Sequence, residues 1–302
     1  MAQSTLETPN NVKESDMCVV CGNAGTENIA VQMPDSSLRV CASCGSWNWF
    51  PRVSASAQNA IHDNADYFEH PYFARRRLVT PALRRRCRDV FARLANLTDI
   101  SLLHSRRFLD VGCDTGVFLK VAREEFGIVP VGIDVAGEPI QRARENGIEA
   151  YQTSIEKAPQ ELSAFAAASA IDLIEHVPDP ATFLQAIATR LIPGGLLYIE
   201  TPNIQSAVYR FGRLFFRLTG GKPDVLLRRL FPPQHVQYFT PASFRGLAEQ
   251  AGLEVANFGL RALPASDIAT SWPALLVIQL LQICDRILGS EILIWAVLRR
   301  PY

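Results

Sequence analysis

The chain of 302 residues carries no net charge, no apolar run long enough for a bilayer and no leader-like segment. Thirty basic and thirty acidic side chains cancel, so no global field attracts nucleic acid, and a nucleic-acid partner is not expected. The longest apolar stretch, 272–284, is followed by Asp285 and Arg286, which predicts no transmembrane helix. Residues 1–16 lack the apolar core of a secretory leader, which predicts a cytoplasmic protein.

Seven cysteines are present, and in a reducing cytoplasm they are not expected to form disulfides. Four of them form two CxxCG motifs that are separated by nineteen residues: Cys18, Cys21, Cys41 and Cys44. Two cysteines at this spacing wrap one side of a tetrahedral ion, and a segment this small has too little core to fold alone. The motifs therefore predict a ribbon closed around a structural Zn²⁺. Its contribution stays open among orienting substrate, contacting a partner and capping the domain.

Short apolar runs alternate with amphipathic segments through the middle of the chain, which indicates βαβ units and a parallel sheet. We expect strands at 108–111, 130–134, 149–151, 166–171 and 196–201, and helices at 117–126, 139–146, 180–191 and 241–251. A later pair of strands at 254–261 and 291–299 would close the sheet. The predicted fold is α/β, a Rossmann-like doubly wound and mostly parallel sheet with an antiparallel last strand, plus the N-terminal zinc ribbon.

A glycine-rich turn follows the first of these strands and opens a helix, in the sequence Leu109-Asp110-Val111-Gly112-Cys113-Asp114-Thr115-Gly116. Glycines there let the backbone approach a ligand closely, and the helix N-terminus favours a carboxylate. Asp134 ends the next strand, where an acidic side chain can bind two ribose hydroxyls. A dinucleotide enzyme would share both features, so the distinction comes from sequence farther along the chain.

Two later segments resemble class I S-adenosylmethionine-dependent methyltransferases. Residues 192–203, IPGGLLYIETPN, are similar to the turn and fifth strand of that family, and residues 171–180, IDLIEHVPDP, to the end of its fourth strand. The resemblance covers residues 107–261. The ribbon, Pro51 and the Tyr67 region also look like a bacterial subgroup of the family.

The resemblance implies a set of cofactor contacts. Asp110, Gly112 and Gly116 would line the methionine end of S-adenosylmethionine, Asp134 would hold the ribose, Ile155 would approach the adenine, and Asp172 would lie beside them. The chain departs from the family pattern at Asp114, where glycine is usual, and at Ser154, where an acidic residue often meets the adenine amine.

A second group of polar residues suggests where an acceptor would react. Asp172, Glu175 and His176 come at one strand end, and His235 lies farther along the chain. The set resembles the metal ligands of small-RNA 2′-O-methyltransferases and the E-x-x-E-H stretch of ubiquinone-pathway O-methyltransferases. Mixed carboxylate and imidazole ligands suit Mg²⁺ or Mn²⁺. Three interpretations stay open: a second metal on all four residues, a metal-free general base at His235 with Glu175 and His176, and a plain pocket wall.

The resemblance also divides the chain. We expect a disordered tail at 1–16, the zinc ribbon at 17–50, a helical connector or cap at 51–103 and the methyltransferase domain at 104–302, with an acceptor-side insert at 205–234 and an apolar helical insert at 263–290. In the connector, Arg84, Arg85 and Arg86 are expected on solvated helix faces.

Arginines alternate with large apolar residues in the first insert, at 209–218. This pattern is typical of a helix on an anionic membrane or over a lipid-linked substrate, of a substrate lid, or of a helix packed on the domain with solvated arginines. Residues 272–288 would dock on that helix or form a homodimer seam.

The function that these patterns favour is methyl transfer from S-adenosylmethionine to a hydroxyl of a small-molecule, sugar or lipid-linked acceptor. Sugar C-methylation, RNA methylation and a non-enzymatic cofactor-binding scaffold, whose ribbon binds a partner, are the alternatives. A cytoplasmic protein is expected, with a peripheral position on the inner membrane face left open.

Overall fold

The structure is a computed structural model, and it describes residues 17–24, 28–33, 36–54, 58, 77–98, 106–220, 230–232, 234–264 and 272–302. The expected tail 1–16, about half of the connector 51–103 and parts of both inserts lie outside these residues, as does Tyr67. Among the described helices, none combines the length and the apolar character that crossing a membrane requires.

A seven-stranded sheet forms the centre of the fold, in the order β10-β11-β8-β7-β4-β5-β6. Five neighbouring strands, β8 to β6 in this order, pair in parallel, and β11 is antiparallel to both of its neighbours, so that β10 again runs in the direction of β8. The predicted sheet with its antiparallel last strand is therefore confirmed. The strands are β4 (Arg107–Val111), β5 (Val129–Asp134), β6 (Glu149–Gln152), β7 (Phe165–Ile171), β8 (Leu191–Pro202), β10 (Glu254–Arg261) and β11 (Leu293–Arg299).

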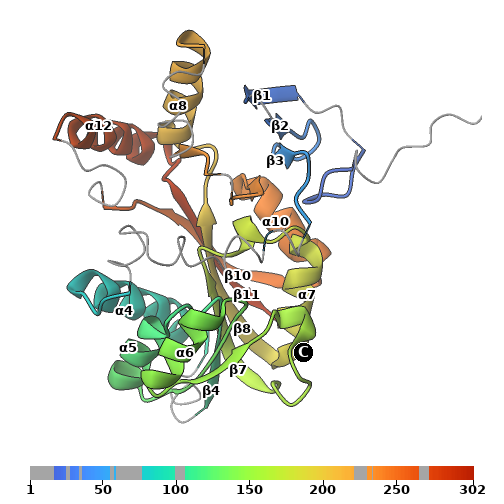
Figure 1. The fold of residues 1–302 in the computed structure, drawn as a ribbon, viewed down its shortest axis with the longest axis vertical. Coiled ribbons are helices and arrows are strands. Elements are labelled where there is room, and N and C mark those ends of the chain that lie inside the picture. Colours follow the sequence, from blue (N-terminus) through green and yellow to red (C-terminus); the bar gives the residue numbers. More distant parts are fainter. Residues whose placement is uncertain are drawn as a thin grey trace, which may run out of the picture.

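Helices cover both faces of this sheet (Figure 1). One core forms between the sheet and α4 (Pro81–Ala95), α5 (Val117–Phe126) and α6 (Gly137–Glu145). The other core forms against α7 (Pro180–Arg190) and α10 (Pro241–Gln250). Helices α7 and α10 begin where the sequence supplies a cap: the Asp179 side chain accepts from Thr182 N at α7, and Thr240 forms a capping box with Ser243 at α10.

A second sheet joins the N-terminal ribbon to the α/β domain. Its order is β1-β2-β3-β9, and all of its pairs are antiparallel. The first three strands belong to the ribbon, whereas β9 lies almost two hundred residues later in the chain. The ribbon is thus built into the larger domain. The strands are β1 (Asn28–Gln32), β2 (Ser37–Val40), β3 (Trp47–Phe50) and β9 (Gln237–Tyr238).

Two further helices, α8 (Ala207–Leu218) and α12 (Trp272–Leu288), pack against each other beyond the carboxyl end of β8 (Figure 1). The buried Asp285 carboxylate of α12 accepts a 2.7 Å hydrogen bond from Ala207 N at the start of α8 and another from Ser290 Oγ at 2.7 Å. This carboxylate therefore joins the last turn of α12 to the first residue of α8. Residues 272–288 therefore do dock on the insert helix, one of the two expected arrangements.

A buried ion network ties α4 to the sheet. The Glu200 side chain is 0% exposed and pairs with Arg261 Nη2 at 2.7 Å and with Arg86. Arg86 also reaches Asp172 Oδ2 at 2.9 Å, and Tyr198 donates its hydroxyl to Glu200. The expectation that Arg86 lies on a solvated face is wrong: its position on α4 turns it toward the carboxylates of β7 and β8. The two guanidinium groups hold the pKa of Glu200 below its usual value despite burial.

We expect Glu200→Ala to lower the free energy of unfolding by about 3–5 kcal/mol, because it removes the carboxylate of Arg261 and leaves Arg86 paired with Asp172 alone. Urea unfolding followed by circular dichroism measures this loss. Glu138→Ala is the matched control, since Glu138 is exposed and pairs only across one helical turn with Arg142. Its cost should be several-fold smaller. Equal losses for the two variants would show that the Glu200 network does not hold the fold.

Candidate cofactor and acceptor site

The glycine-rich turn between β4 and α5 has no room for a side chain at two positions. Gly112 and Gly116 have φ angles of 76° and 71°, in the left-handed region that glycine adopts without strain. A Cβ at Gly112 would lie 2.9 Å from Leu173 Cδ2, and one at Gly116 would lie 3.0 Å from Ile148 Cγ1. Both positions therefore require glycine, because of their backbone conformation and because Leu173 and Ile148 pack directly against them.

Two buried carboxyl groups lie at the carboxyl ends of β4 and β5. Asp134 accepts hydrogen bonds from Asp114 N and Ala136 N, each at 3.0 Å, and Asp110 accepts one from Ser169 Oγ at 2.6 Å. Burial raises the pKa of Asp134 to about 6 and that of Asp110 to about 7, although these hydrogen bonds act against the shift. Both groups therefore titrate close to neutral pH.

The two departures from the family pattern keep the local backbone intact. Asp114 has a φ of 46°, so it adopts the left-handed conformation expected of a glycine, and its carboxylate pairs with Arg77 Nε at 2.9 and 3.1 Å. Ser154 precedes the short 3-10 helix η3 (Ile155–Lys157), and Ile155 is buried at its start. The turn thus retains its shape, and the added charge of Asp114 is paired.

Asp172 lies apart from the other three polar residues with which the sequence analysis groups it. Its φ of 54° reverses the chain directly after β7, and its carboxylate pairs with Arg86 on α4. The ligand atoms that do converge belong to Glu175, His176 and His235, and they lie within 4.8 Å of one another. The expected group of four residues is therefore a group of three, because the Asp172 carboxylate pairs with the Arg86 guanidinium instead.

The three remaining side chains are fixed by specific contacts. Thr201 Oγ1 donates to Glu175 Oε2 at 2.9 Å, and Glu175 is 1% exposed. His176 Nδ1 lies 2.9 Å from the Gln234 carbonyl oxygen, which favours the tautomer with the proton on Nδ1 and a lone pair on Nε2. The His176 and His235 rings meet edge to face at 4.6 Å between centroids. A carboxylate and two imidazoles in this arrangement can accept a proton or hold a cation.

This cluster lies next to the glycine-rich turn. Leu173, which contacts the position of Gly112, precedes the short 3-10 helix η4 (Ile174–His176) that carries Glu175 and His176. The predicted cofactor residues and the predicted acceptor residues therefore meet at one edge of the sheet, where the carboxyl ends of parallel strands gather.

The ribbon holds the segment that carries His235. Trp47 and Asn48 of β3 pair with β9, and Trp49 N donates to the Val236 carbonyl at 3.0 Å. From β9, Gln237 Nε2 donates to the carbonyl oxygens of Ile174 at 2.9 Å and Val177 at 2.8 Å, on either side of Glu175 and His176. One short strand thus connects the ribbon to all three polar side chains.

Several of these positioning residues are missing from the sequence-based set. Arg86, Thr201 and Gln237 are polar residues without a motif, and nothing in the local sequence marks their partners. The sequence offers one signal, the run PPQHVQYF around His235. In this run Gln234 directly precedes the histidine, and Gln237 follows it by two residues.

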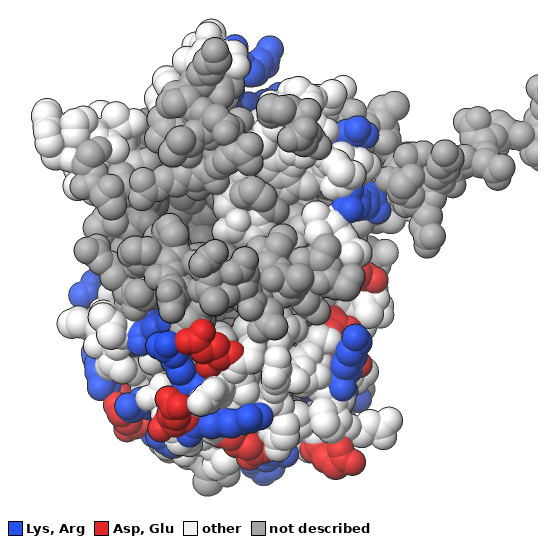
Figure 2. Space-filling view, in the orientation of Figure 1, with Lys and Arg blue, Asp and Glu red and all other residues white. Residues whose placement is uncertain are grey.

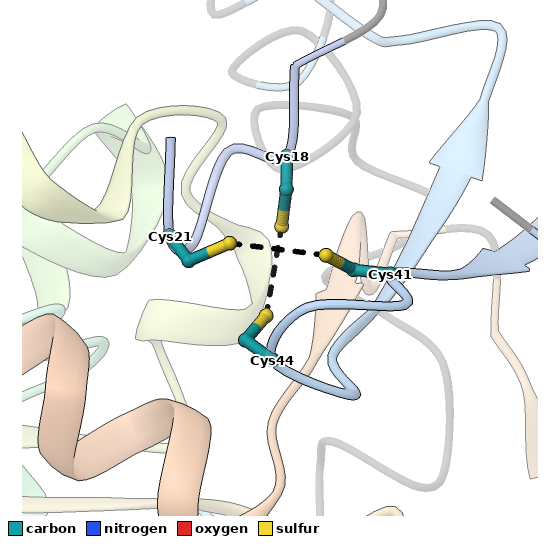
Figure 3. A group of neighbouring side chains, drawn as sticks. All are labelled: Cys18, Cys21, Cys41 and Cys44. Carbon is teal, nitrogen blue, oxygen red and sulfur yellow. Dashed lines mark hydrogen bonds between the residues drawn. The ribbon is translucent and has the colours of Figure 1, made fainter. Parts of the chain in front are cut away.

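The four cysteines of the ribbon converge on one point (Figure 3). Cys18 Sγ lies 3.8 Å from Cys44 Sγ, and Cys21 Sγ lies 3.8 Å from Cys41 Sγ. Four thiolates at about 2.3 Å from a tetrahedral ion are separated by about 3.8 Å, so these distances fit such an ion. Gly22 and Gly45, which follow the two knuckles, have φ angles of 69° and 74° and turn their amides back toward the Cys18 and Cys41 carbonyls.

Comparisons with known proteins agree with this geometry. The family model described as a methyltransferase domain matches residues 79–257. A ubiquinone biosynthesis O-methyltransferase of Aeromonas salmonicida is 34% identical over 176 residues, which cover 55% of this chain and 70% of that protein. The protein of the same name from Bordetella avium is 30% identical over 176 residues, 55% of this chain and 68% of its own.

Solved structures share the fold. Phosphoethanolamine N-methyltransferase 2 of Haemonchus contortus, in complex with S-adenosyl-L-methionine, gives a TM-score of 0.56 at 14% identity, over 85% of this chain and 63% of that chain. A candidate sarcosine dimethylglycine methyltransferase of Galdieria sulphuraria gives a TM-score of 0.51 at 16% identity, over 74% of this chain and 92% of that chain. At these identities the likeness concerns the fold alone.

We expect the purified protein to contain one tightly held metal ion per chain, and Cys41→Ser to lose both the ion and several degrees of thermal stability, because Cys41 is a buried member of the cluster. Metal analysis together with a thermal melt measures this. Cys284→Ser is the matched control, since Cys284 is exposed and belongs to α12. Full metal content in Cys41→Ser would contradict the four-cysteine site.

Proposed function

Because the chain belongs to the methyltransferase-domain family and is a class I S-adenosylmethionine-dependent methyltransferase, we propose that it methylates a hydroxyl oxygen of a small-molecule acceptor. The observation that carries this proposal is the group of Glu175, His176 and His235 beside the glycine-rich turn. An oxygen nucleophile must lose its proton during transfer, and this group can receive or stabilise it. The O-methyltransferase names of the curated relatives favour the same chemistry.

The residues present fit S-adenosylmethionine. The glycine-rich turn would take its methionine portion against the backbone at Gly112 and Gly116, and the Asp134 carboxylate would accept hydrogen bonds from two ribose hydroxyls. The apolar Ile155 would lie against the adenine, with Asp110 beneath the turn. When bound, S-adenosylmethionine supplies a methyl group on a positively charged sulfur. The chain then has to orient the acceptor in line with that carbon and to take up the hydroxyl proton.

We propose two metal sites. The four cysteines would hold Zn²⁺ as a closed structural site, because their mutual distances fit tetrahedral thiolate coordination. Glu175, His176 and His235 would hold Mg²⁺ or Mn²⁺, with the Nε2 lone pair of His176 directed by the Gln234 carbonyl on Nδ1. Such a cation would lower the pKa of a hydroxyl that binds it. Without a cation, the same imidazoles would act as the base.

The proposed cofactor site should weaken in acid. Ionised Asp134 is the form that accepts two hydroxyls, so binding favours deprotonation and affinity falls as pH drops through the pKa of about 6. From pH 8 to pH 5 we expect about tenfold weaker binding of S-adenosylhomocysteine from this group, measured by titration calorimetry.

Two variants separate the acidic groups. Asp134→Asn should bind S-adenosylhomocysteine more weakly at pH 8, and its affinity should no longer change near pH 6. Asp110→Asn should lose only the change in affinity near pH 7. Circular dichroism at each pH checks that the fold persists. A pH-independent affinity in the unchanged protein would contradict the ribose role of Asp134.

The proposed activity is tested with S-adenosylmethionine that carries a radiolabelled methyl group, offered with phenols, catechols and monosaccharides. We expect label on an acceptor oxygen and a loss of about 10²–10⁴ in kcat for His235→Ala, the usual effect of removing a general base. The dissociation constant of S-adenosylhomocysteine should not change. A variant that loses cofactor affinity instead would place His235 outside the acceptor site.

A Mn²⁺ titration of the zinc-loaded protein distinguishes a metal site at Glu175, His176 and His235 from a metal-free base. Glu175→Gln and His235→Ala should weaken Mn²⁺ binding by more than the roughly tenfold that an outer-shell partner contributes. Asp172→Asn is the control and should retain it, because Asp172 pairs with Arg86 outside the cluster. Absent or unchanged Mn²⁺ binding would assign His235 as a metal-free base.

A further inference from the structure

The helices α8 and α12 present a broad apolar surface at one end of the molecule. Leu218, Trp272 and Ile287 are 78%, 74% and 79% exposed, fractions that large apolar side chains rarely reach on a soluble domain. We call the whole surface the α8–α12 face. It consists of Phe211, Leu214, Leu218, Trp272, Leu276, Leu280, Ile283, Ile287 and Leu288, all of which are exposed.

The spacing of these residues is helical. On α12, exposed apolar side chains recur at 272, 276, 280, 283 and 287, and steps of three and four residues keep them on one side of an α-helix. Fifteen residues at 1.5 Å each make this stripe about 22 Å long. On α8, Phe211, Leu214 and Leu218 repeat the pattern at i, i+3 and i+7.

The opposite sides of both helices are already occupied. Asp285 of α12 is buried against the start of α8, and Ile278 and Leu281 pack on the core that α8 shares with the ribbon. Arg213 of α8 stacks over the Trp47 ring at 5.3 Å. The rotation of the two helices is therefore set by internal contacts, and the α8–α12 face is directed outward by the fold.

The exposed charged side chains of the two helices have one sign. Arg210 and Arg217 are exposed on α8, and Arg286 is exposed on α12. Asp285 is the one acidic residue in the two helices, and its carboxylate is buried as a helix cap. Figure 2 shows blue without red at the α8 end of the visible face, whereas the two colours mix over the α/β domain.

We propose that the α8–α12 face is a binding surface for an anionic lipid membrane. Apolar side chains on one side of a helix insert between lipid head groups, and arginines beside them attract anionic lipids. Trp272 at the end of α12 is of the residue type that favours the membrane–water interface. A second copy of the chain fits less well, because a symmetric contact would bring the arginines of both copies together.

The surface lies on the acceptor side of the protein. α8 begins five residues after β8 ends, at the edge of the sheet where Thr201 contacts Glu175. The proposal does not depend on the proposed function, because lipid binding is measured without methyl transfer.

Vesicle sedimentation of the full, zinc-loaded chain tests the proposal. We expect it to bind vesicles that contain phosphatidylglycerol and to bind phosphatidylcholine vesicles at least about tenfold more weakly, since each arginine near an anionic surface contributes about fivefold. Leu280→Glu and Arg210→Glu should each lower binding to the anionic vesicles by about tenfold or more. Val129→Glu and Arg85→Glu are the matched controls, exposed on β5 and α4, and should bind normally.

Cys284 provides a second readout. All seven cysteines are among the described residues, and Cys284 alone is exposed, beside the stripe on α12. A polarity-sensitive dye on this thiol should shift its emission to the blue with phosphatidylglycerol vesicles, and the shift should vanish in Leu280→Glu. No binding, or equal binding in Leu280→Glu, would overturn the proposal. So would a dimer in sedimentation velocity that Leu280→Glu dissociates.

Discussion

The pairing of β3 with β9 is the contact on which the acceptor side of the molecule depends. β9 has only two residues, and a strand of that length has little stability unless a neighbour supplies the ladder. That neighbour, β3, belongs to a ribbon whose own core is too small to fold without its four-cysteine cluster. The position of His235 therefore depends on the cysteine cluster through the β3–β9 pairing.

The carboxyl edge of the parallel sheet collects buried acidic groups, and the fold treats them in two ways. Glu200 is paired with two guanidinium groups and stays ionised. Asp110 and Asp134 receive neutral hydrogen-bond donors, which compensate burial less, so their pKa values rise toward neutrality. The first arrangement serves the fold, since Arg86 and Arg261 join α4 and β10 to β8. The second leaves carboxylates whose remaining lone pairs can meet a polar ligand.

The parts of the fold that the sequence predicts are those determined by local pattern. Strand and helix positions from β4 to β11 follow from apolar periodicity and from caps such as Asp179 and Thr240, which act within a few residues. The cysteine cluster and the glycine-rich turn are likewise short motifs. The mostly parallel sheet with its antiparallel last strand was predictable because strand and helix alternation at this length allows few topologies, whereas the order of the strands is a finding of the structure.

What the sequence does not predict depends on contacts between distant residues. The partner of Asp172 is Arg86, eighty-six positions earlier in the chain, and its placement requires knowing how α4 lies on the sheet. The predicted metal set of four residues therefore included Asp172, whose carboxylate already pairs with the Arg86 guanidinium. The β3–β9 pairing joins segments farther apart still, so the role of the ribbon could not be derived from its cysteines. In both cases tertiary contacts between distant segments decided which of the predicted residues meet.

The ribbon and the two outer helices form one unit. α8 lies between them, with Arg213 on Trp47 of the ribbon sheet and Ala207 N on Asp285 of α12. Because a packed helix cannot tilt toward one neighbour without disturbing the other, a change in the ribbon would reach both the α8–α12 face and the segment with His235. A closed four-cysteine site has no open coordination position for chemistry. We infer that its role is mechanical, since it fixes the relative position of the proposed membrane-binding surface and the group proposed to take the acceptor proton.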